Sequence, residues 1–167
     1  MQLIRPYTSR GQDYQRSSFM SRVLVANRGV AAVRIASTLR RLKLESVGLR
    51  SACEQDAEYL RVFDQVVDLN GEDCAQAYLA AEEIVRIAQD CQSEMIHPGW
   101  GFLSENVQFA EKVEKAGLKL IGPTPATVRD FGQKHIAREL AEAAGVPLLP
   151  GSGLIQETQT ALNFCDR

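Results

Sequence analysis

The sequence predicts an α/β fold built on an open parallel sheet with helices on both faces. Short apolar runs, typical of buried strands, alternate with amphipathic helical segments along most of the chain of 167 residues. Turn pairs such as Asn-Gly, Gly-Pro and Pro-Gly separate these segments. Repeated alternation of strand and helix favours right-handed crossovers, which produce a Rossmann-like parallel sheet.

The first half of the chain is expected to form three strands, because three short apolar runs are bounded by turn residues. These strands are 23–26, 46–49 and 66–69, the last closed by the turn pair Asn70-Gly71. Two longer segments, 30–43 and 75–91, are expected to form helices whose apolar positions fall on one face. Those positions are Ala32, Ile35, Ala36, Leu39 and Leu42 in the first helix, and Leu79, Ile84, Val85 and Ala88 in the second. A short helix is expected around 56–63.

The second half repeats the pattern, with strands expected at 94–97 and 118–121 and a helix between them. The apolar positions of that helix are Val107, Ala110, Val113 and Ala116. Ser104 is expected to cap it, with Glu105 in its first turn, and Gly117 is expected to end it. The remaining expected elements are a short helix that starts at Pro125 behind the cap Thr124, a helix at 134–144, a last strand at 148–149 and a frayed helix within 156–167.

Charge and composition exclude several classes of protein. The chain has 19 basic and 21 acidic residues and a net charge of −2, which differs from the basic stripe of a general nucleic-acid binder. No apolar run approaches the roughly 18 residues that cross a bilayer, so no membrane partner is expected. A metal site is not expected, because the chain has two histidines and no CxxC pair. The four cysteines are expected to be reduced thiols in a cytosol-like compartment: Cys53, Cys74, Cys91 and Cys165.

Residues 1–21 differ from the rest of the chain and are expected to form a flexible leader. Arginine outnumbers acid there, and serine, glutamine and tyrosine are frequent. A mitochondrial presequence has a similar charge balance, but Pro6 and Gly11 interrupt any amphipathic helix. Another alternative is that the native start is Met20. The expected location is cytoplasmic, with a mitochondrial location as the minor alternative.

Two loops follow expected strands at their carboxyl ends, where ligands bind in open parallel sheets. They are Asn-Arg-Gly at 27–29 and Pro-Gly-Trp-Gly at 98–101. Both lead into helix starts, whose free N–H groups favour anions. The first loop holds a single glycine, so the GxGxxG fingerprint of dinucleotide-binding proteins is absent. Arg28 is a candidate anion ligand, but a salt-bridge partner or a surface charge is an equally good interpretation.

Other residues near these loops have both a functional and a structural interpretation. Trp100 either covers a ligand or packs, and His97 either transfers protons or makes a structural hydrogen bond. For Glu105, the structural interpretation is a favourable interaction of its negative charge with the helix dipole. Lys134 opens a helix, where a cation opposes the dipole, so contact with a phosphate is one reason for its position. A solvated lysine is the alternative.

Taken together, these segments resemble the N-terminal domain of biotin carboxylase, the ATP-dependent component of biotin-dependent carboxylases. The matching segments are RVLVANRG at 22–29, Arg34, HPGWGFLSEN at 97–106, FAEKVEKAGLKLIGP at 109–123 and GVPLLPGS at 145–152. Two further segments are similar to the urea carboxylase branch, which includes urea amidolyase. These are LNGEDCAQAY at 69–78 and GQKHIAR at 132–138.

The resemblance implies cofactors, partners and roles for single residues. The family carboxylates biotin on a carrier domain with MgATP and bicarbonate. Lys134 matches a lysine that contacts ATP phosphates, and Arg34 matches an arginine in a helix used for dimer contacts. Arg28 and Arg34 are the candidates for anion binding or an interface. The residues expected beside the carboxylation centre are Pro98, Gly99, Trp100, Gly101, Glu105 and Asn106.

The sequence departs from the family pattern at two residues and in its extent. Val30 stands where the family has an acid, and Trp100 where it has a tyrosine. Residues 22–155 correspond to the Rossmann-like domain before the ATP-grasp region, and 156–167 to a tail leading toward that region. The family's ATP lid, magnesium ligands, bicarbonate-binding residues and catalytic glutamate and arginine are absent. We therefore expect a weak, incomplete ATP site, biotin and magnesium only in a complete parent enzyme, no catalytic or metal-binding residue here and no turnover by this chain alone.

Three functions are compatible with these observations. In the first, the chain is the leading part of a urea carboxylase-like enzyme, with an ATP-grasp region and a biotin carrier domain as partners. In the second, it is a non-catalytic module that forms a homodimer, or dimerises with or regulates a full-length carboxylase. In the third, it is an unrelated Rossmann-like nucleotide binder, which the absence of GxGxxG disfavours.

Overall fold

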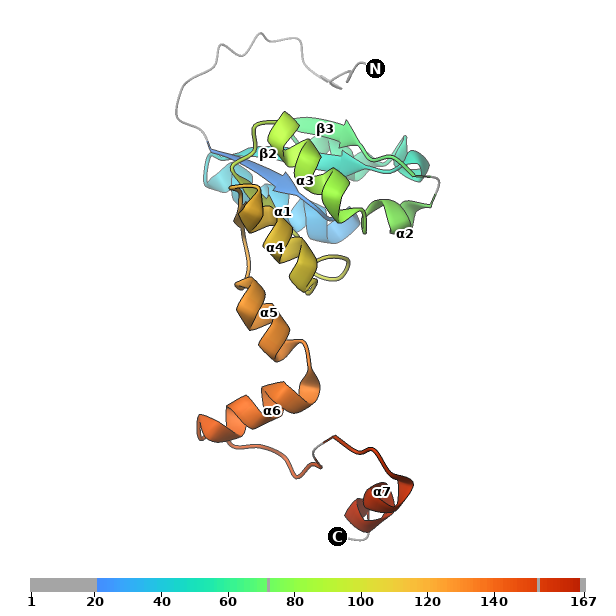
Figure 1. Cartoon of the computed structure of the whole chain (residues 1–167). Coiled ribbons are helices and arrows are strands. Elements are labelled where there is room, and N and C mark those ends of the chain that lie inside the picture. The colour runs from blue at the N-terminus through green and yellow to red at the C-terminus, as the bar shows by residue number, and fades with distance from the viewer. Residues whose placement is uncertain (1–20, 72, 153, 166–167) are drawn as a thin grey trace. The chain divides into compact units, whose positions relative to one another are not determined.

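The computed structural model describes residues 21–71, 73–152 and 154–165 (Figure 1). These residues fall into two compact units, one ending at Pro125 and one beginning at Ala126, and each unit is considered by itself. The expected leader lies outside the described residues except for Ser21. Within the described part of the chain, none of the helices is long and apolar enough to cross a membrane.

A five-stranded parallel sheet forms the centre of the first unit. Its strands are β1 (Arg22–Val25), β2 (Glu45–Arg50), β3 (Gln65–Asp68), β4 (Met95–His97) and β5 (Lys119–Leu120). Their order is β3-β2-β1-β4-β5, and each neighbouring pair is parallel. The predicted α/β fold is confirmed. Because the strand order reverses beside β1, the switch point of the sheet lies between β1 and β4.

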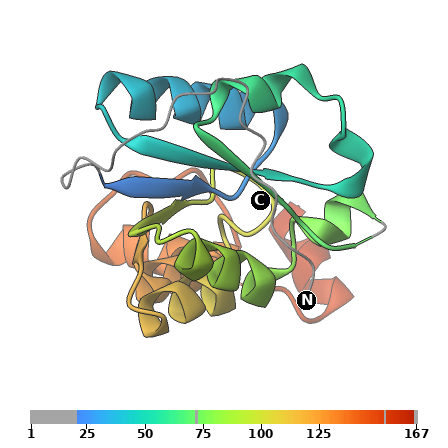
Figure 2. The same ribbon diagram turned by 90° about the horizontal axis from the view of Figure 1, so that it is seen from above.

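Helices cover both faces of this sheet, as predicted (Figure 2). Successive side chains of a strand point to opposite faces. Val25 therefore packs with the helix α1 (Gly29–Arg41), while Leu24 belongs to the core on the opposite face. That opposite core also contains the buried side chains of α3 (Ala81–Asp90) and α4 (Val107–Lys115). The two apolar layers fix the sheet, and with it the loops at its carboxyl edge.

The prediction of one helix over 75–91 is wrong. The structure has a short helix α2 (Cys74–Ala77), then a break, then α3. Tyr78 lies at the break because its ring is fully buried and its hydroxyl reaches the Leu49 carbonyl oxygen at 2.9 Å. Leu79, which was expected on the apolar face, is exposed instead.

The predicted cap of α4 is also wrong. Asn106 is the cap, and its Oδ1 accepts a hydrogen bond from the Phe109 N–H at 2.8 Å. Ser104 and Glu105 precede the helix, so Glu105 does not lie in the first turn. Gly117 follows the helix with a φ of +75°, which confirms that a glycine ends it.

Three other segments differ from their expected form. Leu42 lies beyond the end of α1 and is exposed. The expected short helix before β3 is a pair of 3-10 helices, η1 (Ala52–Glu54) and η2 (Glu58–Val62). The expected strand at 148–149 is not formed, and the Leu149 carbonyl oxygen accepts instead from the Arg138 guanidinium at 2.7 Å.

The described residues of the second unit form helices and irregular chain. The helices are α5 (Pro125–Phe131), which begins at the boundary, α6 (Lys134–Ala143) and α7 (Thr158–Cys165). Their positions agree with the prediction, but α6 and α7 contain no buried residue. Large apolar side chains are exposed throughout this unit: Phe131, Leu140, Val146, Leu149, Leu154 and Leu162. An apolar surface of this kind is typical of a segment that packs against further protein.

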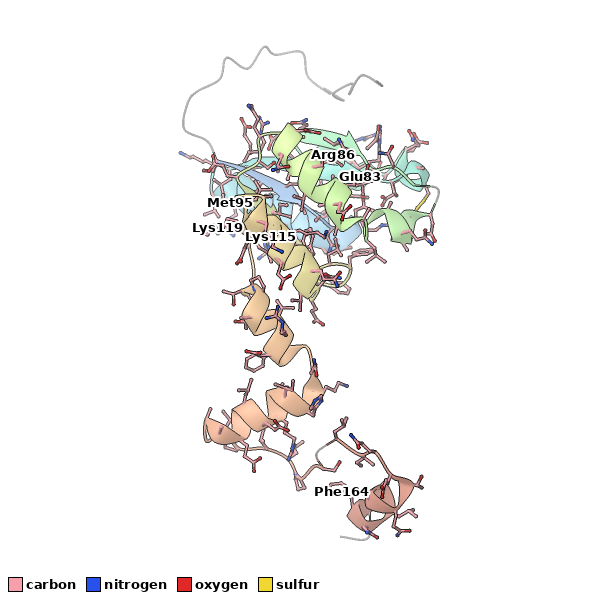
Figure 3. All side chains as sticks on the ribbon, viewed as in Figure 1. Glu83, Arg86, Met95, Lys115, Lys119 and Phe164 are labelled. Atoms are coloured by element: carbon pink, nitrogen blue, oxygen red, sulfur yellow. A yellow bond between two sulfur atoms is a disulfide. The ribbon has the colours of Figure 1, made fainter. Side chains whose placement is uncertain are left out.

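The structure pairs two of the four cysteines that were expected to be reduced thiols. The pair is Cys53 and Cys74, whose Cα atoms are 6.2 Å apart (Figure 3). The sequence separation of 21 residues gives no sign of this pair, because the fold alone brings η1 and α2 together. Cys91 is a buried free thiol and Cys165 an exposed one.

Candidate functional site at the carboxyl edge of the sheet

The side chain of Asn27 joins the two loops that the sequence singles out. Asn27 follows β1 and is buried beside the end of β4. Its Nδ2 donates to the carbonyl oxygens of Pro98 at 2.7 Å and Trp100 at 2.9 Å. Its Oδ1 accepts from the Arg28 N–H at 2.9 Å. One amide group thereby fixes the path of both loops across the switch point.

Gly99 approaches Asn27 so closely that only glycine fits. Its φ is +68°, and a Cβ atom there would lie 2.6 Å from Asn27 Nδ2. The Gly99 N–H donates to His97 Nδ1 at 3.0 Å, and burial lowers the pKa of His97. Because Nδ1 acts as an acceptor, the imidazole is neutral in this arrangement. The geometry therefore favours the structural interpretation of His97, a hydrogen bond that shapes the turn.

A second cluster surrounds the carboxylate of Glu54, beside the first loop. Its Oε1 lies 2.8 Å from Arg28 Nε and accepts from the Tyr59 hydroxyl at 2.9 Å. Its Oε2 accepts from the N–H and the hydroxyl of Ser51, at 3.1 Å and 2.6 Å. The Tyr78 hydroxyl lies 2.9 Å from the same oxygen. The side chain of Glu54 is 3% exposed, so these partners satisfy a buried charge.

The surroundings of Glu54 keep its carboxylate ionised. Burial by itself raises the pKa of Glu54, but hydrogen bonds from Ser51, then from Tyr78 and Tyr59, outweigh burial and bring the pKa below its usual value. Burial raises the pKa of Tyr59 to about 12 and also raises that of Tyr78. Both phenols therefore stay protonated at neutral pH and can donate hydrogen bonds to the carboxylate.

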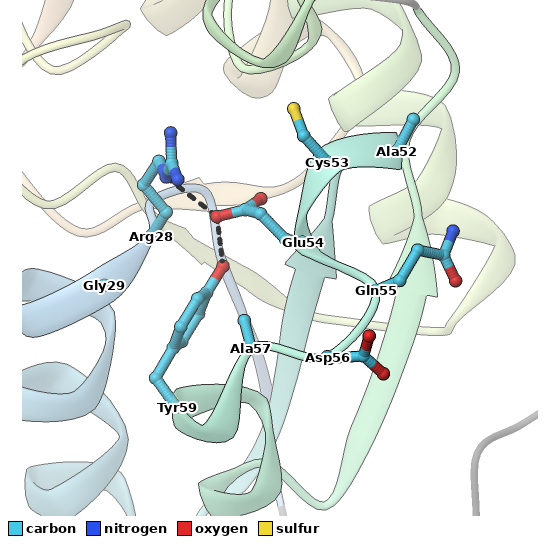
Figure 4. Close-up of a pocket in the computed structure, with 9 residues that line it drawn as sticks. All are labelled: Arg28, Gly29, Ala52, Cys53, Glu54, Gln55, Asp56, Ala57 and Tyr59. Atoms are coloured by element: carbon cyan, nitrogen blue, oxygen red, sulfur yellow. Dashed lines mark hydrogen bonds and ion pairs between the residues drawn. The ribbon is translucent and has the colours of Figure 1, made fainter.

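A pocket of about 440 Å³, the size of a small-ligand site, lies beside the Glu54 cluster (Figure 4). Its lining residues are Arg28, Gly29, Ala52, Cys53, Glu54, Gln55, Asp56, Ala57 and Tyr59. Figure 4 shows Arg28 and Tyr59 converging on Glu54 at one wall. The charge of Arg28 is thus balanced by a buried partner. Within the described residues, no group of three or more His, Cys, Asp or Glu side chains is placed to hold a metal ion.

Other residues singled out from the sequence lie on separate elements. The Trp100 side chain is 77% exposed, and Glu105 is exposed ahead of α4. Arg34 is exposed on α1, where its guanidinium donates to the Thr38 hydroxyl of the same helix. Lys134 is exposed as the first residue of α6, in the second unit. The roles of these residues toward a ligand or a partner stay predictions.

The sequence predictions miss the Glu54 cluster and the clamping role of Asn27. One signal for the cluster is present, since Ser51 and Glu54 have the spacing of a capping box. Tyr59 and Tyr78 have no such signal, because their hydroxyl groups come together only when distant segments pack. Arg28 is in contact with the buried acid, which agrees with the salt-bridge interpretation.

A switch point between β1 and β4, with two clamped loops and a pocket at the carboxyl edge, defines a Rossmann-like domain. The family model that matches this chain is described as "Biotin carboxylase, N-terminal domain", and it matches residues 19–128. Because this match spans more than half of the chain, the chain belongs to that family. The resemblance carried by the sequence motifs is confirmed.

Relatives with known names agree with this assignment. The chain is 43% identical over 145 residues to urea amidolyase of Lachancea kluyveri, covering 87% of this chain but 8% of the amidolyase. It is 41% identical over 136 residues to biotin carboxylase of Allochromatium vinosum, covering 81% of this chain and 30% of that protein. One similar solved structure is a biotin carboxylase domain dimer, from the 2-oxoglutarate carboxylase of Hydrogenobacter thermophilus, in complex with MgADP and bicarbonate. Its TM-score to this chain is 0.82 at 35% sequence identity, and the match covers 87% of this chain and 32% of that chain.

Proposed function

We propose that this chain supplies the N-terminal module of an ATP- and bicarbonate-dependent biotin carboxylase. The family membership supports this function, and the Asn27 clamp is the observation that carries it. The clamp holds Pro98 and Trp100 in one fixed loop at the edge where ligands of open parallel sheets bind. In the proposed enzyme, this loop lies beside the carboxylation centre, together with Glu105 and Asn106.

The parent enzyme that we propose is urea carboxylase-like. The identity to urea amidolyase supports this branch, as do the segments 69–78 and 132–138. The chain spans less than a tenth of the amidolyase and about a third of the biotin carboxylase. We therefore assign turnover to an assembled carboxylase, with an ATP-grasp region and a biotin carrier domain as partners, and no catalytic residue to this chain. The proposed location of this assembly is the cytoplasm.

The described residues fit one end of the proposed nucleotide. Lys134 is an exposed cation at the start of α6, where the free N–H groups of the helix also favour phosphate oxygens. When bound in a complete enzyme, MgATP supplies the phosphoryl group that activates bicarbonate. The contribution of this chain is to hold the phosphates electrostatically at Lys134. Biotin and magnesium belong to the complete parent enzyme in this proposal.

A non-catalytic dimerisation or regulatory role is the second candidate. The observation that favours it is the exposed position of Arg34 on α1. The apolar face of this helix packs on the sheet, while the Arg34 side chain lies at the surface. The solved 2-oxoglutarate carboxylase domain is a dimer, which supports pairing with a full-length carboxylase or with a second copy of this chain.

Calorimetry with ATP tests the role proposed for Lys134. We expect the chain to bind ATP weakly, and Lys134→Ala to weaken binding about tenfold or more, because a charge-assisted contact contributes roughly 1.5–3 kcal/mol. Lys115→Ala is the matched control, since Lys115 is another exposed lysine, in the last turn of α4, and its removal should leave binding unchanged. Equal binding by Lys134→Ala and the parent chain contradicts this role. Tight binding of NAD supports the third possibility, an unrelated nucleotide binder.

A further inference from the structure

The aromatic ring of Tyr78 lies close to both loops at the carboxyl edge of the sheet. Its centroid is 5.3 Å from the centroid of the Phe102 ring, which follows the second loop directly, and the two planes are tilted by 35°. The guanidinium carbon of Arg28, in the first loop, lies 6.0 Å from the same Tyr78 centroid. These distances are those of an aromatic pair and of a cation–π contact. Tyr78 is therefore a second link between the two loops, in addition to the side chain of Asn27.

The rest of the fold holds Tyr78 itself in place. Its side chain is fully buried, among the apolar residues of the core that also contains the buried faces of α3 and α4. Its hydroxyl lies 2.9 Å from the Leu49 carbonyl oxygen and 2.9 Å from Glu54 Oε2. A side chain that is locked by packing and hydrogen bonds is a rigid support for a neighbouring loop.

Phe102 has a backbone conformation that a phenylalanine seldom adopts by itself. Its φ is +44°, in the left-handed region that favours glycine and asparagine. It is the second residue of a tight turn, in which the Ser104 N–H donates to the Gly101 carbonyl oxygen at 2.9 Å. Turns with a positive φ at this position have mostly glycine, asparagine or aspartate there. A strained residue of this kind keeps its conformation only where its surroundings hold it.

Two contacts together determine the φ of Phe102. The hydrogen bond from Ser104 orients the peptide group before Phe102, and the ring contact with Tyr78 fixes the direction of the Cα–Cβ bond. Without the ring contact, Phe102 can rotate toward a less strained φ. Gly101 permits this rotation, because a Cβ atom there would have no neighbour within 4 Å and glycine adopts most backbone angles. The turn hydrogen bond then opens more often.

We propose that Tyr78 is a positioning residue for the loop 98–103, which it holds through the ring of Phe102. Trp100 then lies between two supports, because Asn27 binds its carbonyl oxygen and Tyr78 packs on the residue two positions later. The Trp100 side chain is mostly exposed, so these supports and not its own packing determine where it lies. In the proposed carboxylase, Tyr78 thereby presents a preformed loop to the carboxylation centre. This last role rests on the proposed function, whereas the support of the loop does not.

Hydrogen exchange of the whole chain tests the support of the loop. Phe102→Leu removes the ring contact but keeps a large apolar residue under the same backbone strain. We expect the Ser104 amide hydrogen to exchange about tenfold faster or more in this variant, because the turn opens locally. The Phe109 N–H, which is bonded to Asn106 Oδ1 in α4, should keep its rate, and this separates local opening from global unfolding. An unchanged rate at Ser104 overturns the proposal.

Two variants at Tyr78 test whether its ring is the support. Tyr78→Phe and Tyr78→Leu both lose the hydroxyl, so the ring distinguishes them. We expect fast exchange at Ser104 in Tyr78→Leu and a rate near that of the parent chain in Tyr78→Phe. Equal rates in the two variants overturn the proposal. If the buried position does not tolerate leucine, Phe102→Leu decides the question, because Phe102 lies at the surface.

Kinetics in an assembled enzyme test the consequence for the proposed reaction. The enzyme is a chimera in which residues 21–155 of this chain replace the matching segment of biotin carboxylase of Allochromatium vinosum. We expect Phe102→Leu to lower kcat/KM for free biotin about fivefold or more, because a less fixed loop positions the reacting group less accurately. The KM for ATP should stay unchanged, since the phosphates are assigned to Lys134.

The outcomes separate this proposal from the proposed function. Equal kcat/KM for biotin in the variant and in an active parent chimera overturns the role of Tyr78 in positioning. A parent chimera without activity contradicts the proposed function instead, and the exchange rates of the chain then decide whether Tyr78 supports the loop.

Discussion

Replacement of Gly99 by alanine is expected to lower the free energy of unfolding by about 2–5 kcal/mol. Two effects add. An alanine at a φ of +68° costs roughly 1–2 kcal/mol, because its Cβ crowds the backbone. The same Cβ would lie 2.6 Å from Asn27 Nδ2, and moving that buried amide leaves the Pro98 and Trp100 carbonyls without their donor, which costs about 1–3 kcal/mol.

Gly101→Ala is the matched control for this experiment. Gly101 has a φ of +72°, but a Cβ atom there has no neighbour within 4 Å. Its replacement should therefore show only the backbone cost of roughly 1–2 kcal/mol. The measurement is denaturant unfolding of the two variants and the parent chain. Equal losses at Gly99 and Gly101 would show that the contact with Asn27 contributes nothing.

Replacement of Glu54 by glutamine is expected to cost about 2–3 kcal/mol of stability at neutral pH. The amide has nearly the shape of the carboxylate, but it has one acceptor oxygen where the cluster needs two, and its NH₂ group faces donors. The oxygen of the amide can still accept at one of the two positions, so either Ser51 or Tyr59 loses its hydrogen bond to a charged group, which is worth roughly 1.5–3 kcal/mol when intact. The loss of the ion pair adds little, because the Arg28 side chain is 41% exposed.

The cost of Glu54→Gln should depend on pH in one direction. The pKa of Glu54 is lowered in the folded chain, so its ionisation contributes stability above its unfolded pKa near 4.5. That contribution is lost as pH falls through the lower, folded pKa. The stability difference between parent and variant should therefore be full at pH 7 and shrink below about pH 4.5. Glu82→Gln, at an exposed ion pair with Lys112, is the control and should be nearly neutral at pH 7. A difference that grows on acidification contradicts this account of Glu54.

The elements with continuous apolar signals were predictable from the sequence. The first five strands lie close to their expected places, because parallel strands buried on both faces appear as short apolar runs. The break between α2 and α3 was not predictable, since helical periodicity continues through Tyr78. The buried contacts of the Tyr78 hydroxyl, with the Leu49 carbonyl oxygen and with Glu54, decide where the break falls. Asn106 replaced the expected cap Ser104 for a similar reason, because either residue type suits a helix start.

The candidate site also has a part that was predictable from the sequence and a part that was not. Both loops at the carboxyl edge follow from the strand order, which sequence alternation predicts. The Glu54 cluster combines residues from the start of α1, from η1 and from the end of α2. Contacts between distant segments depend on the packed fold, so spacing along the chain predicts them poorly.

A chimera with biotin carboxylase of Allochromatium vinosum tests the central claim most directly. Residues 21–155 of this chain replace the matching segment of that enzyme, with which the chain is 41% identical over 136 residues. The measurement is bicarbonate-dependent ATP hydrolysis with free biotin, compared with a version of the enzyme that lacks the segment. If this chain is the N-terminal module of a carboxylase, the chimera hydrolyses ATP in a biotin-dependent manner and the deletion does not. A folded chimera that is no more active than the deletion would contradict the proposed function.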